Sequence, residues 1–390
     1  MSARVLKLAV MVALLSTPAL AADPPPPPGG AAILMWTPEQ QAYGYRNMEK
    51  VGPVHVVKRG DHVRELPVAA AAIDPKWTWD GKAQTVDSYM AAMRTSGLLV
   101  LKDGKIVLER YGLGRAPGER WTSFSVAKSM TSTLVGAAIK DGFIKSLDDP
   151  VTAYIPGLKG GGYEGVTVRQ LITMTSGVKW NEDYSDPNSD VAKVGLSITE
   201  PGVNPVVSYM RRLPRETAPG AKFVYKTGET DLAGILVSKA VGKPLSQYLS
   251  EKIWAPYGME QDAVWVDDVA GHERGGCCMS MTLRDYARIG QFMLECGKAG
   301  GVQVLPQGWV ADATSPHVTF PPGGTETGYG YFWWLVGDGY AAEGIFGQQI
   351  FVFPADRLVI AINSAWPSAD APELWAAQAA LAQAIRAAAK

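Results

Sequence analysis

The chain has 390 residues, of which 47% are hydrophobic and 19% are charged, and its formal net charge is −1. A chain of this size can bury a sizeable core in one large domain or two. The near-neutral charge argues against nucleic acid as a partner, and no stretch after the N-terminus is long and apolar enough to span a bilayer.

Residues 1–21 have the pattern of a secretory signal peptide. Arg4 and Lys7 precede a short apolar run, and the cleavage rule for small residues places the cut between Ala21 and Ala22. The alternative, a membrane anchor, would need a longer apolar run. We therefore expect an exported protein, most simply periplasmic, with no membrane anchor after signal removal.

Three further segments follow the signal peptide. Residues 22–30 are a Pro/Gly-rich linker. Residues 31–85 show little periodicity, and we expect an N-terminal extension that packs on the main domain. That domain should occupy residues 86–390.

The main domain is predicted to begin with a β-hairpin over residues 97–113, with Asp103-Gly104 at its turn. A helix from Ser125 to about Gly142 follows, and then helices near 167–175, 205–212, 229–241, 245–254 and 282–296. Strands over 329–336, 347–353 and 358–363 precede a last helix over about 370–388. Strands from both ends of the chain predict one α/β (α+β) sheet unit with an inserted, mainly helical region at about 145–290.

Ser125 and Lys128 open the helix within Trp121–Lys140, WTSFSVAKSMTSTLVGAAIK. A serine hydroxyl needs a base within hydrogen-bond reach to act as a nucleophile. Residues i and i+3 share one helix face, and burial can lower the pKa of a lysine enough for it to be that base. The alternative is that Ser125 is a helix N-cap. The same spacing recurs at Ser176 and Lys179, but there the serine ends a helix.

Other catalytic patterns are missing from the sequence. It has no G-x-S-x-G, no H-E-x-x-H and only four histidines, so we expect neither a metal nor a cofactor. A disulfide from Cys277 or Cys278 to Cys296 would have to span a helix of about 21 Å. We therefore expect free or buried thiols.

Tyr225, in Phe223–Gly228, is a candidate proton donor for the leaving group. A phenol near a lysine ammonium can pass a proton more easily than its reference pKa of about 10 suggests. The alternative is a turn tyrosine packed on the core.

Six segments in register resemble the serine β-lactamase and penicillin-binding protein superfamily. Within it they look like the class C-like branch of 6-aminohexanoate-dimer hydrolases and family VIII esterases. The segments, spread over about residues 90–385, are SFSVAKSMTSTLVG, DDPVTAYIPGL, VRQLITMTSGVKW, YKT, GG…MTLRDYARIGQFML and GQQIFVFPADRLVIAIN. The resemblance implies a β-lactamase/DD-peptidase-like antiparallel sheet flanked by helices.

The same resemblance implies roles for individual residues. Ser125 would be the acylated nucleophile, Lys128 its base and Tyr225 the proton shuttle. The backbone N–H groups of Ser125 and Ile345 would form the oxyanion hole. The expected substrate contacts are Tyr184, Gly344 and Phe346.

The third motif departs from the family pattern, because Glu343-Gly-Ile-Phe-Gly347 carries no cation where β-lactamases have Lys-Thr-Gly. A literal Lys226-Thr-Gly228 lies instead inside the tyrosine motif, and we interpret it as a decoy. The expected function is therefore hydrolysis of small esters or linear amides through an acyl-enzyme. The alternatives are a periplasmic DD-peptidase or β-lactamase and a catalytically dead binding module. The sequence leaves the exact substrate and the oligomeric state open.

Overall fold

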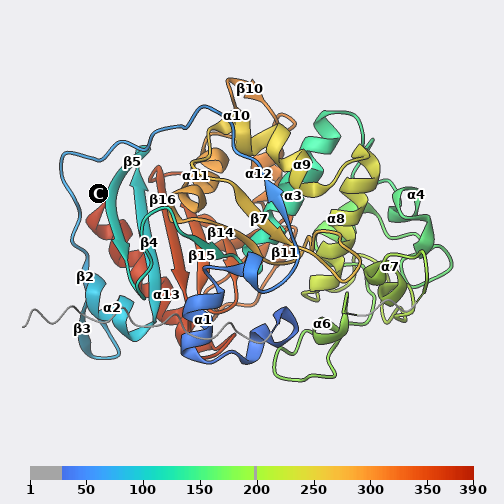
Figure 1. Cartoon of the computed structure of the whole chain (residues 1–390), viewed down its shortest axis with the longest axis horizontal. Helices are drawn as coiled ribbons and strands as arrows, with labels where there is room; N and C mark the ends of the chain where they lie inside the picture. Colours follow the sequence, from blue (N-terminus) through green and yellow to red (C-terminus); the bar gives the residue numbers. More distant parts are fainter. Residues whose placement is uncertain (1–28, 197–199) are drawn as a thin grey trace, which may run out of the picture.

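The computed structural model describes residues 29–196 and 200–390 (Figure 1). The predicted signal peptide, residues 1–21, and most of the linker lie outside these ranges. Within them, no helix combines the length and the apolarity that crossing a membrane requires.

An antiparallel sheet forms the centre of the described part of the chain, with the strand order β11-β12-β13-β14-β15-β16-β4-β5. β16 pairs with β4, so strands from the two ends of the chain meet, as the sequence predicts. The strands are β4 Thr95–Lys102, β5 Lys105–Tyr111, β11 Val318–Thr319, β12 Gly328–Tyr329, β13 Trp334–Val336, β14 Gly339–Gly344, β15 Gln348–Phe353 and β16 Leu358–Ser364.

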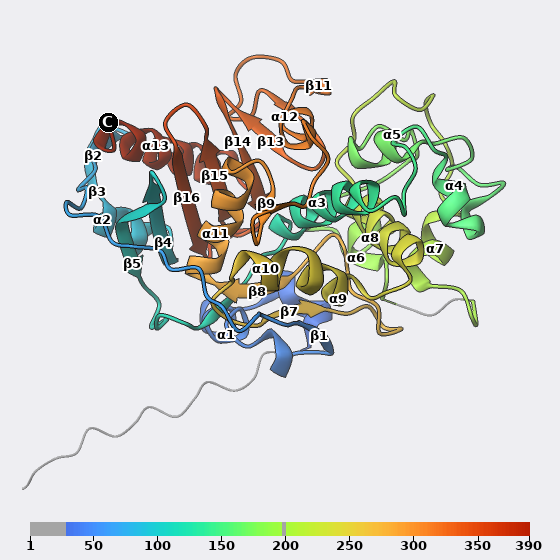
Figure 2. The same ribbon diagram turned by 90° about the horizontal axis from the view of Figure 1, so that it is seen from above.

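Both faces of this sheet are buried, because successive side chains along a strand point to opposite faces. On β4, Leu98 and Val100 pack in the cluster that contains Leu381 of α13 (Pro372–Ala388). Leu99 and Leu101 belong to the other cluster, with α11 (Leu283–Leu294). Figures 1 and 2 show α13 and α11 on opposite faces. The sequence prediction of an antiparallel sheet flanked by helices is confirmed.

The region between β6 and α11 is mainly helical and gathers on the side of the molecule away from α13 (Figure 2). Its helices are α3 Val126–Lys140, α4 Val151–Tyr154, α5 Val168–Ile172, α6 Asp190–Lys193, α7 Pro205–Met210, α8 Thr227–Val241, α9 Leu245–Leu249 and α10 Ala255–Tyr257. A smaller sheet that the sequence analysis did not anticipate has the order β1-β7-β8-β6, from β1 Val54–Val57, β7 Ala263–Val266, β8 Met279–Thr282 and β6 Arg120–Thr122.

The segment before residue 95 lies along the main domain. α1 (Pro38–Gly44) is followed by Tyr45, which packs in one aromatic cluster with Trp36, Phe124 and Phe346. The remaining strands and α-helices are α2 Val86–Ala92, α12 Trp309–Ala313, the β2–β3 pair Lys76–Trp79 and Lys82–Thr85, and the β9–β10 pair Lys298–Ala299 and Val302–Gln303. Short 3-10 helices are η1 Gly30–Met35, η2 Met48–Lys50 and η3 Pro156–Leu158, and a π-helical turn, η4 Ser250–Trp254, joins α9 to α10.

One local prediction needs correction. The strand predicted over 329–336 is divided into β12 and β13, because Phe332 between them has a φ of +58° and turns the chain. Residues 222–226, which include Tyr225, have no regular structure before α8 begins.

The expectation of free thiols is wrong for Cys277 and Cys278, which form a disulfide with their Cα atoms 3.7 Å apart. The distance argument excluded only a disulfide to Cys296, which is far away along a helix. It did not apply to Cys277 and Cys278, which are adjacent in the sequence. Cys296 is free and exposed.

Candidate active site

Ser125 is at the N-cap position of α3, but its side chain makes no capping hydrogen bond. When Lys128, one helical turn later, is protonated, its Nζ donates a hydrogen bond of 3.0 Å to the Ser125 Oγ. Ser125 is among the residues that line a cavity, whereas Lys128 is buried beneath it. The Ser125 side chain therefore lies beside a buried lysine at the cavity and is not in the capping geometry.

Lys128 has three partners around Nζ: Ser125 Oγ, Thr227 Oγ1 at 2.9 Å and the carbonyl oxygen of Gly276 at 2.7 Å. A carbonyl can only accept, and the Thr227 hydroxyl already donates to Glu182. A neutral amine has two N–H donors and one lone pair. The two acceptors use the donors, so the lone pair is left for the Ser125 hydroxyl.

Burial lowers the pKa of Lys128 to about 8, with Arg274 acting in the same direction. The carboxylates of Glu182 and Asp231 oppose the shift because they favour the ammonium form. A substantial fraction of the lysine is therefore neutral near pH 8, which is the form that a general base requires.

Glu182 organises one wall of the site, and the sequence analysis missed it. Its carboxylate accepts hydrogen bonds from Trp180 Nε1, from Tyr184 OH at 2.9 Å, and from the Thr227 N–H at 2.9 Å as well as the Thr227 hydroxyl. Thr227 belongs to the Lys-Thr-Gly that the sequence analysis set aside. This Lys-Thr-Gly does not lie where the family's third motif lies. The Thr227 hydroxyl nevertheless links Glu182 to Lys128. The position of Thr227, two residues after Tyr225, could have indicated that it belongs to the site.

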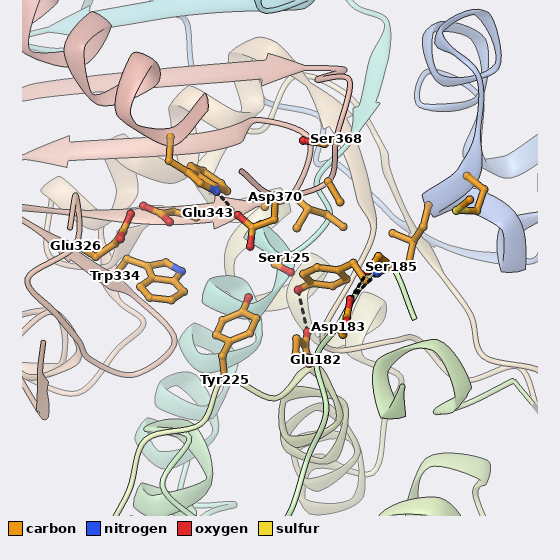
Figure 3. A pocket seen from close by; sticks show the side chains of 17 residues that line it. Ser125, Glu182, Asp183, Ser185, Tyr225, Glu326, Trp334, Glu343, Ser368 and Asp370 are labelled. Carbon is orange, nitrogen blue, oxygen red and sulfur yellow. Dashed lines mark hydrogen bonds between the residues drawn. The ribbon is translucent and has the colours of Figure 1, made fainter. Parts of the chain in front are cut away.

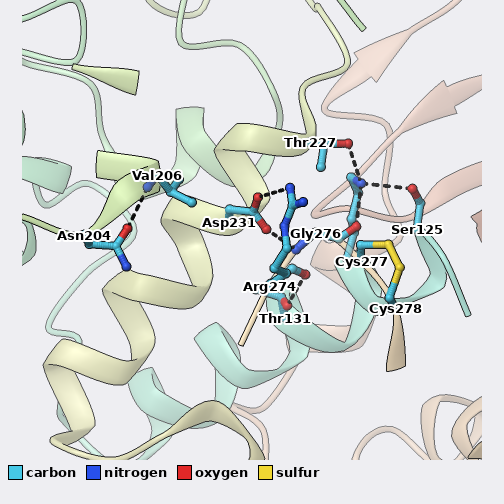
Figure 4. Close-up of polar contacts among 12 residues, drawn as sticks. Ser125, Thr131, Asn204, Val206, Thr227, Asp231, Arg274, Gly276, Cys277 and Cys278 are labelled. Carbon is cyan, nitrogen blue, oxygen red and sulfur yellow. Dashed lines mark hydrogen bonds and ion pairs between the residues drawn. A yellow bond between two sulfur atoms is a disulfide. The ribbon is translucent and has the colours of Figure 1, made fainter. Parts of the chain in front are cut away.

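The loop that presents the Gly276 carbonyl is held from two helices (Figure 4). Asp231 of α8 accepts from the Gly276 N–H at 2.8 Å and pairs with Arg274 at 2.9 Å. Thr131 of α3 donates to the Gly275 carbonyl at 2.7 Å. These contacts fix the direction of the carbonyl that faces Lys128.

Tyr225 lies beside Ser125 in the cavity lining (Figure 3), and its ring stacks on Trp334 at 5.4 Å. Nζ of Lys128 is 5.1 Å from the ring centroid. Burial, followed by the charge of Glu182, raises the pKa of Tyr225 well above its usual value. The expectation of an easily ionised phenol is therefore corrected: Tyr225 is neutral in the resting site and holds its proton.

The end of β14 approaches the start of α3 closely. A Cβ added to Gly344 would lie 2.4 Å from the Ser123 carbonyl oxygen and 3.0 Å from the Ser125 nitrogen. The N–H groups of Ser125 and Ile345 donate to no other residue in the described ranges. Two N–H donors without a partner among the described residues thus flank Ser125, the arrangement that an oxyanion hole requires.

The predicted substrate contacts divide into two groups. Tyr184 and Gly344 line the cavity with Ser125. Phe346 is not among the lining residues, because it is buried against Tyr45 and Phe124 in the aromatic cluster. Its assignment as a substrate contact is corrected to a packing residue.

The second Ser-x-x-K copy does not form a comparable pair. Ser176 is buried and donates to Glu229, while Lys179 is exposed and lies 3.9 Å from Glu216. Glu229 also forms a buried ion pair with Lys226 at 3.4 Å. These contacts are part of the core beneath Tyr225.

The cavity has a volume of about 670 Å³ and a strongly acidic lining (Figure 3). Its lining includes five acidic side chains and, within the described chain, no lysine, arginine or histidine; the acidic side chains are Glu182, Asp183, Glu326, Glu343 and Asp370. Across residues 29–196 and 200–390, no group of three or more His, Cys, Asp or Glu side chains is arranged to hold a metal ion.

Comparison with known proteins identifies relatives of this chain. The sequence model of the Beta-lactamase family matches residues 83–383. The chain is 33% identical, over 291 residues, to a 6-aminohexanoate-dimer hydrolase of Paenarthrobacter ureafaciens, which covers 71% of this chain and 74% of that protein.

Solved structures share its fold. One described as "Putative 6-aminohexanoate-dimer hydrolase from Bacillus anthracis" superposes with a TM-score of 0.81 at 23% identity, covering 92% of this chain and 98% of the other. A family VIII carboxylesterase superposes with a TM-score of 0.57 at 16% identity, covering 76% and 96% respectively.

Proposed function

Since the chain belongs to the β-lactamase family and is a serine hydrolase, we propose that Ser125 forms an acyl-enzyme with short esters or linear amides, in the manner of a 6-aminohexanoate-dimer hydrolase. The observation that carries the proposal is the set of three hydrogen-bond partners around Nζ of Lys128. Only the Ser125 hydroxyl among its three partners is free to donate to a neutral lysine.

The reaction follows from this geometry. Ser125 Oγ attacks the carbonyl carbon as Lys128 takes the hydroxyl proton, and the N–H groups of Ser125 and Ile345 stabilise the oxyanion. Tyr225 gives its proton to the leaving alcohol or amine, and the Lys128 ammonium replaces it. Water, deprotonated by the same relay, then attacks the acyl-enzyme and releases the acid.

The acidic cavity supports the choice of substrate class. A β-lactam carries a carboxylate beside its scissile bond, and no cation among the lining residues would pair with it. Neutral esters and amides need no such partner. The DD-peptidase or β-lactamase alternative uses the same three side chains, so it is distinguished by substrate alone.

A fluorophosphonate probe tests the nucleophile. We expect mass spectrometry to place the adduct on the Ser125 peptide, and we expect Ser125→Ala to abolish labelling and hydrolysis. Ser176→Ala is the matched control: it should keep both, although losing a donor to buried Glu229 should lower the free energy of unfolding by about 1–3 kcal/mol. An adduct on another residue would overturn the assignment, and an unlabelled wild-type protein would favour a binding module.

Steady-state kinetics tests the substrate class. We expect measurable kcat/KM on p-nitrophenyl esters of short acids, hydrolysis of linear ω-amino-acid amides, and poor turnover of benzylpenicillin. Faster turnover of benzylpenicillin than of every ester and amide would instead support the alternative.

A further inference from the structure

We propose that Leu34 and Met35, on the N-terminal segment, form an apolar wall that binds the hydrocarbon chain of the substrate's acyl group and thereby determines which acyl chains the site prefers. This inference rests on the proposed function, because it assumes that the acyl group becomes attached to Ser125. It deepens that function by naming the part of the substrate that one side of the cavity receives.

The N-terminal segment reaches the cavity beside Ser125. Leu34 and Met35, at the end of η1, are among the residues that line it. In Figure 3 the N-terminal segment, drawn in blue, lies on the Ser185 side of Ser125 and away from Trp334. Residues far from Ser125 in the sequence thus contribute to one side of the cavity.

Apolar residues gather on this side of the cavity. Leu34 packs against the hydrophobic cluster that includes Ile345, as do Tyr184 and Ala369. All four line the cavity together with Met35. Such a surface suits a hydrocarbon chain, because contact between the two removes apolar area from water.

The acidic side chains on this side already have hydrogen-bond donors. Glu182 accepts from the Tyr184 hydroxyl and the Thr227 N–H, both at 2.9 Å. Asp183 accepts from the N–H of Ser185 at 2.8 Å and from its hydroxyl at 2.7 Å. The contacts left for a substrate chain on this side are therefore mainly apolar. The other acidic side chains of the lining lie on the Trp334 side of Ser125 (Figure 3): Glu326, Glu343 and Asp370.

The geometry of the proposed reaction directs the acyl chain to the apolar side. Tyr225 gives its proton to the leaving group, so the leaving group lies next to the phenol, whose ring stacks on Trp334 at 5.4 Å. The leaving group and the acyl chain extend in different directions from the carbonyl carbon that Ser125 attacks. The acyl chain therefore extends away from Trp334 and toward the N-terminal segment (Figure 3).

The segment is anchored directly after Met35, while the Met35 side chain stays exposed. Met35 is 80% exposed, whereas Trp36 is 5% exposed and its ring packs on Tyr45 at 5.8 Å. Thr37 then caps α1. The backbone is thus held in place, and the unbranched, flexible side chain of Met35 can adapt to a hydrocarbon chain that covers it.

The test is kcat/KM on p-nitrophenyl esters with unbranched acyl groups from acetyl to hexanoyl, each divided by the rate of spontaneous hydrolysis. These esters share one leaving group, so their differences report on the acyl side. Moving one methylene group from water to an apolar surface corresponds to about fourfold in affinity, so the hexanoate-to-acetate ratio should be at least about tenfold. A ratio near one would overturn the proposal.

Variants of the wall connect this preference to its residues. Leu34→Ala combined with Met35→Ala should lower the hexanoate-to-acetate ratio at least about fivefold, because it removes several methylene contacts. Val302→Ala is the matched control: Val302 is 66% exposed, does not line the cavity, and its loss should leave the ratio unchanged. A structural effect would lower kcat/KM for all esters equally, and an unchanged ratio in the double variant would overturn the proposal.

Two further substitutions guard against misfolding. If the double variant does not fold, Met35→Ala replaces it, because it removes an exposed side chain, and it should lower the ratio in the same direction. Met35→Leu keeps an apolar side chain and should keep most of the preference. A ratio that Met35→Ala leaves at the wild-type value would then overturn the proposal.

Equilibrium binding separates the wall from catalysis. On Ser125→Ala, calorimetry should show hexanamide binding at least about tenfold more tightly than acetamide, and the alanine substitutions at Leu34 and Met35 should reduce that difference. If this holds but the wild-type protein hydrolyses no ester or amide, the proposed function fails and the apolar wall stands. If esters are hydrolysed with no preference that depends on Leu34 and Met35, the wall fails and the proposed function stands.

Discussion

Lys128 is the residue whose protonation controls the proposed chemistry. Burial favours its neutral form, Arg274 adds to that effect, and the carboxylates of Glu182 and Asp231 act against it. The result is a pKa of about 8, well below that of an exposed lysine. A base with this pKa is partly available near neutral pH and fully available in mild alkali.

We predict that kcat/KM for a neutral ester rises with pH through a midpoint of about 8. The sign follows from the active form: only the neutral lysine accepts the proton, so the rate should change tenfold per pH unit well below the midpoint and level off above it. Initial rates between pH 5.5 and 10 measure this. A profile that is flat from pH 6 to 9 would contradict the role of Lys128.

Glu182→Gln provides the control for that profile. Its charge raises the pKa of Lys128, so removing it should move the midpoint to lower pH, even if the maximal rate also falls. A purely structural effect of the substitution would lower the rate without moving the midpoint.

The partners of Lys128 come from different elements, which pack closely against one another. α3 carries Ser125 and Lys128, α8 begins at Thr227, and the loop before β8 contributes the Gly276 carbonyl. A Cβ on Gly276 would lie 2.9 Å from both Cγ2 and the carbonyl oxygen of Thr227. The loop can therefore approach α8 only with glycine at this position.

We predict that Gly276→Ala lowers kcat at least tenfold, because the added methyl group must push the carbonyl away from Lys128. Gly52→Ala is the matched control, since nothing lies within 4 Å of the Cβ it would add and its φ is not in the left-handed region. Circular dichroism and steady-state kinetics on both variants measure this. Equal activity of the two variants would show that the carbonyl position is not critical.

At the scale of the whole molecule, the N-terminal segment packs behind Ser125, the proposed nucleophile. The Tyr45 ring packs edge-on against Phe124 at 5.1 Å and Trp121 at 5.6 Å, and its carbonyl accepts from the Thr122 N–H at 2.8 Å. Phe124 precedes Ser125 and has a φ of +44°, an uncommon conformation for a bulky residue that its surroundings must hold in place.

We predict that Tyr45→Ala lowers the free energy of unfolding by about 3–5 kcal/mol, as expected for deleting a buried aromatic ring. It should also slow labelling of Ser125 by the fluorophosphonate. Tyr45→Phe keeps the ring and should change both quantities little. Denaturant unfolding and labelling rates measure this, and an alanine variant with the stability and rate of wild type would show that the segment packs without supporting the site.

The local sequence pattern was sufficient to predict part of this architecture and the pair of residues at the centre of the site. Ser125 and Lys128 are three residues apart on one helix, so helical geometry alone brings their side chains together. Strands β4, β15 and β16 and helices α3, α8, α11 and α13 follow from periodicity, which depends only on neighbouring residues.

Only the tertiary structure decided which distant groups surround Lys128. Thr227 and Gly276 are 99 and 148 residues away from it in sequence, and no local pattern encodes such contacts. The same holds for Phe346, whose type suited a substrate contact but whose side chain the fold buries. It also holds for the pKa of Tyr225, because a sequence shows a nearby cation but not the loss of water around the phenol. The sequence thus determined the pairing of Ser125 with Lys128, the proposed nucleophile and base, and burial and long-range packing determined the pKa of Lys128 and the groups around it.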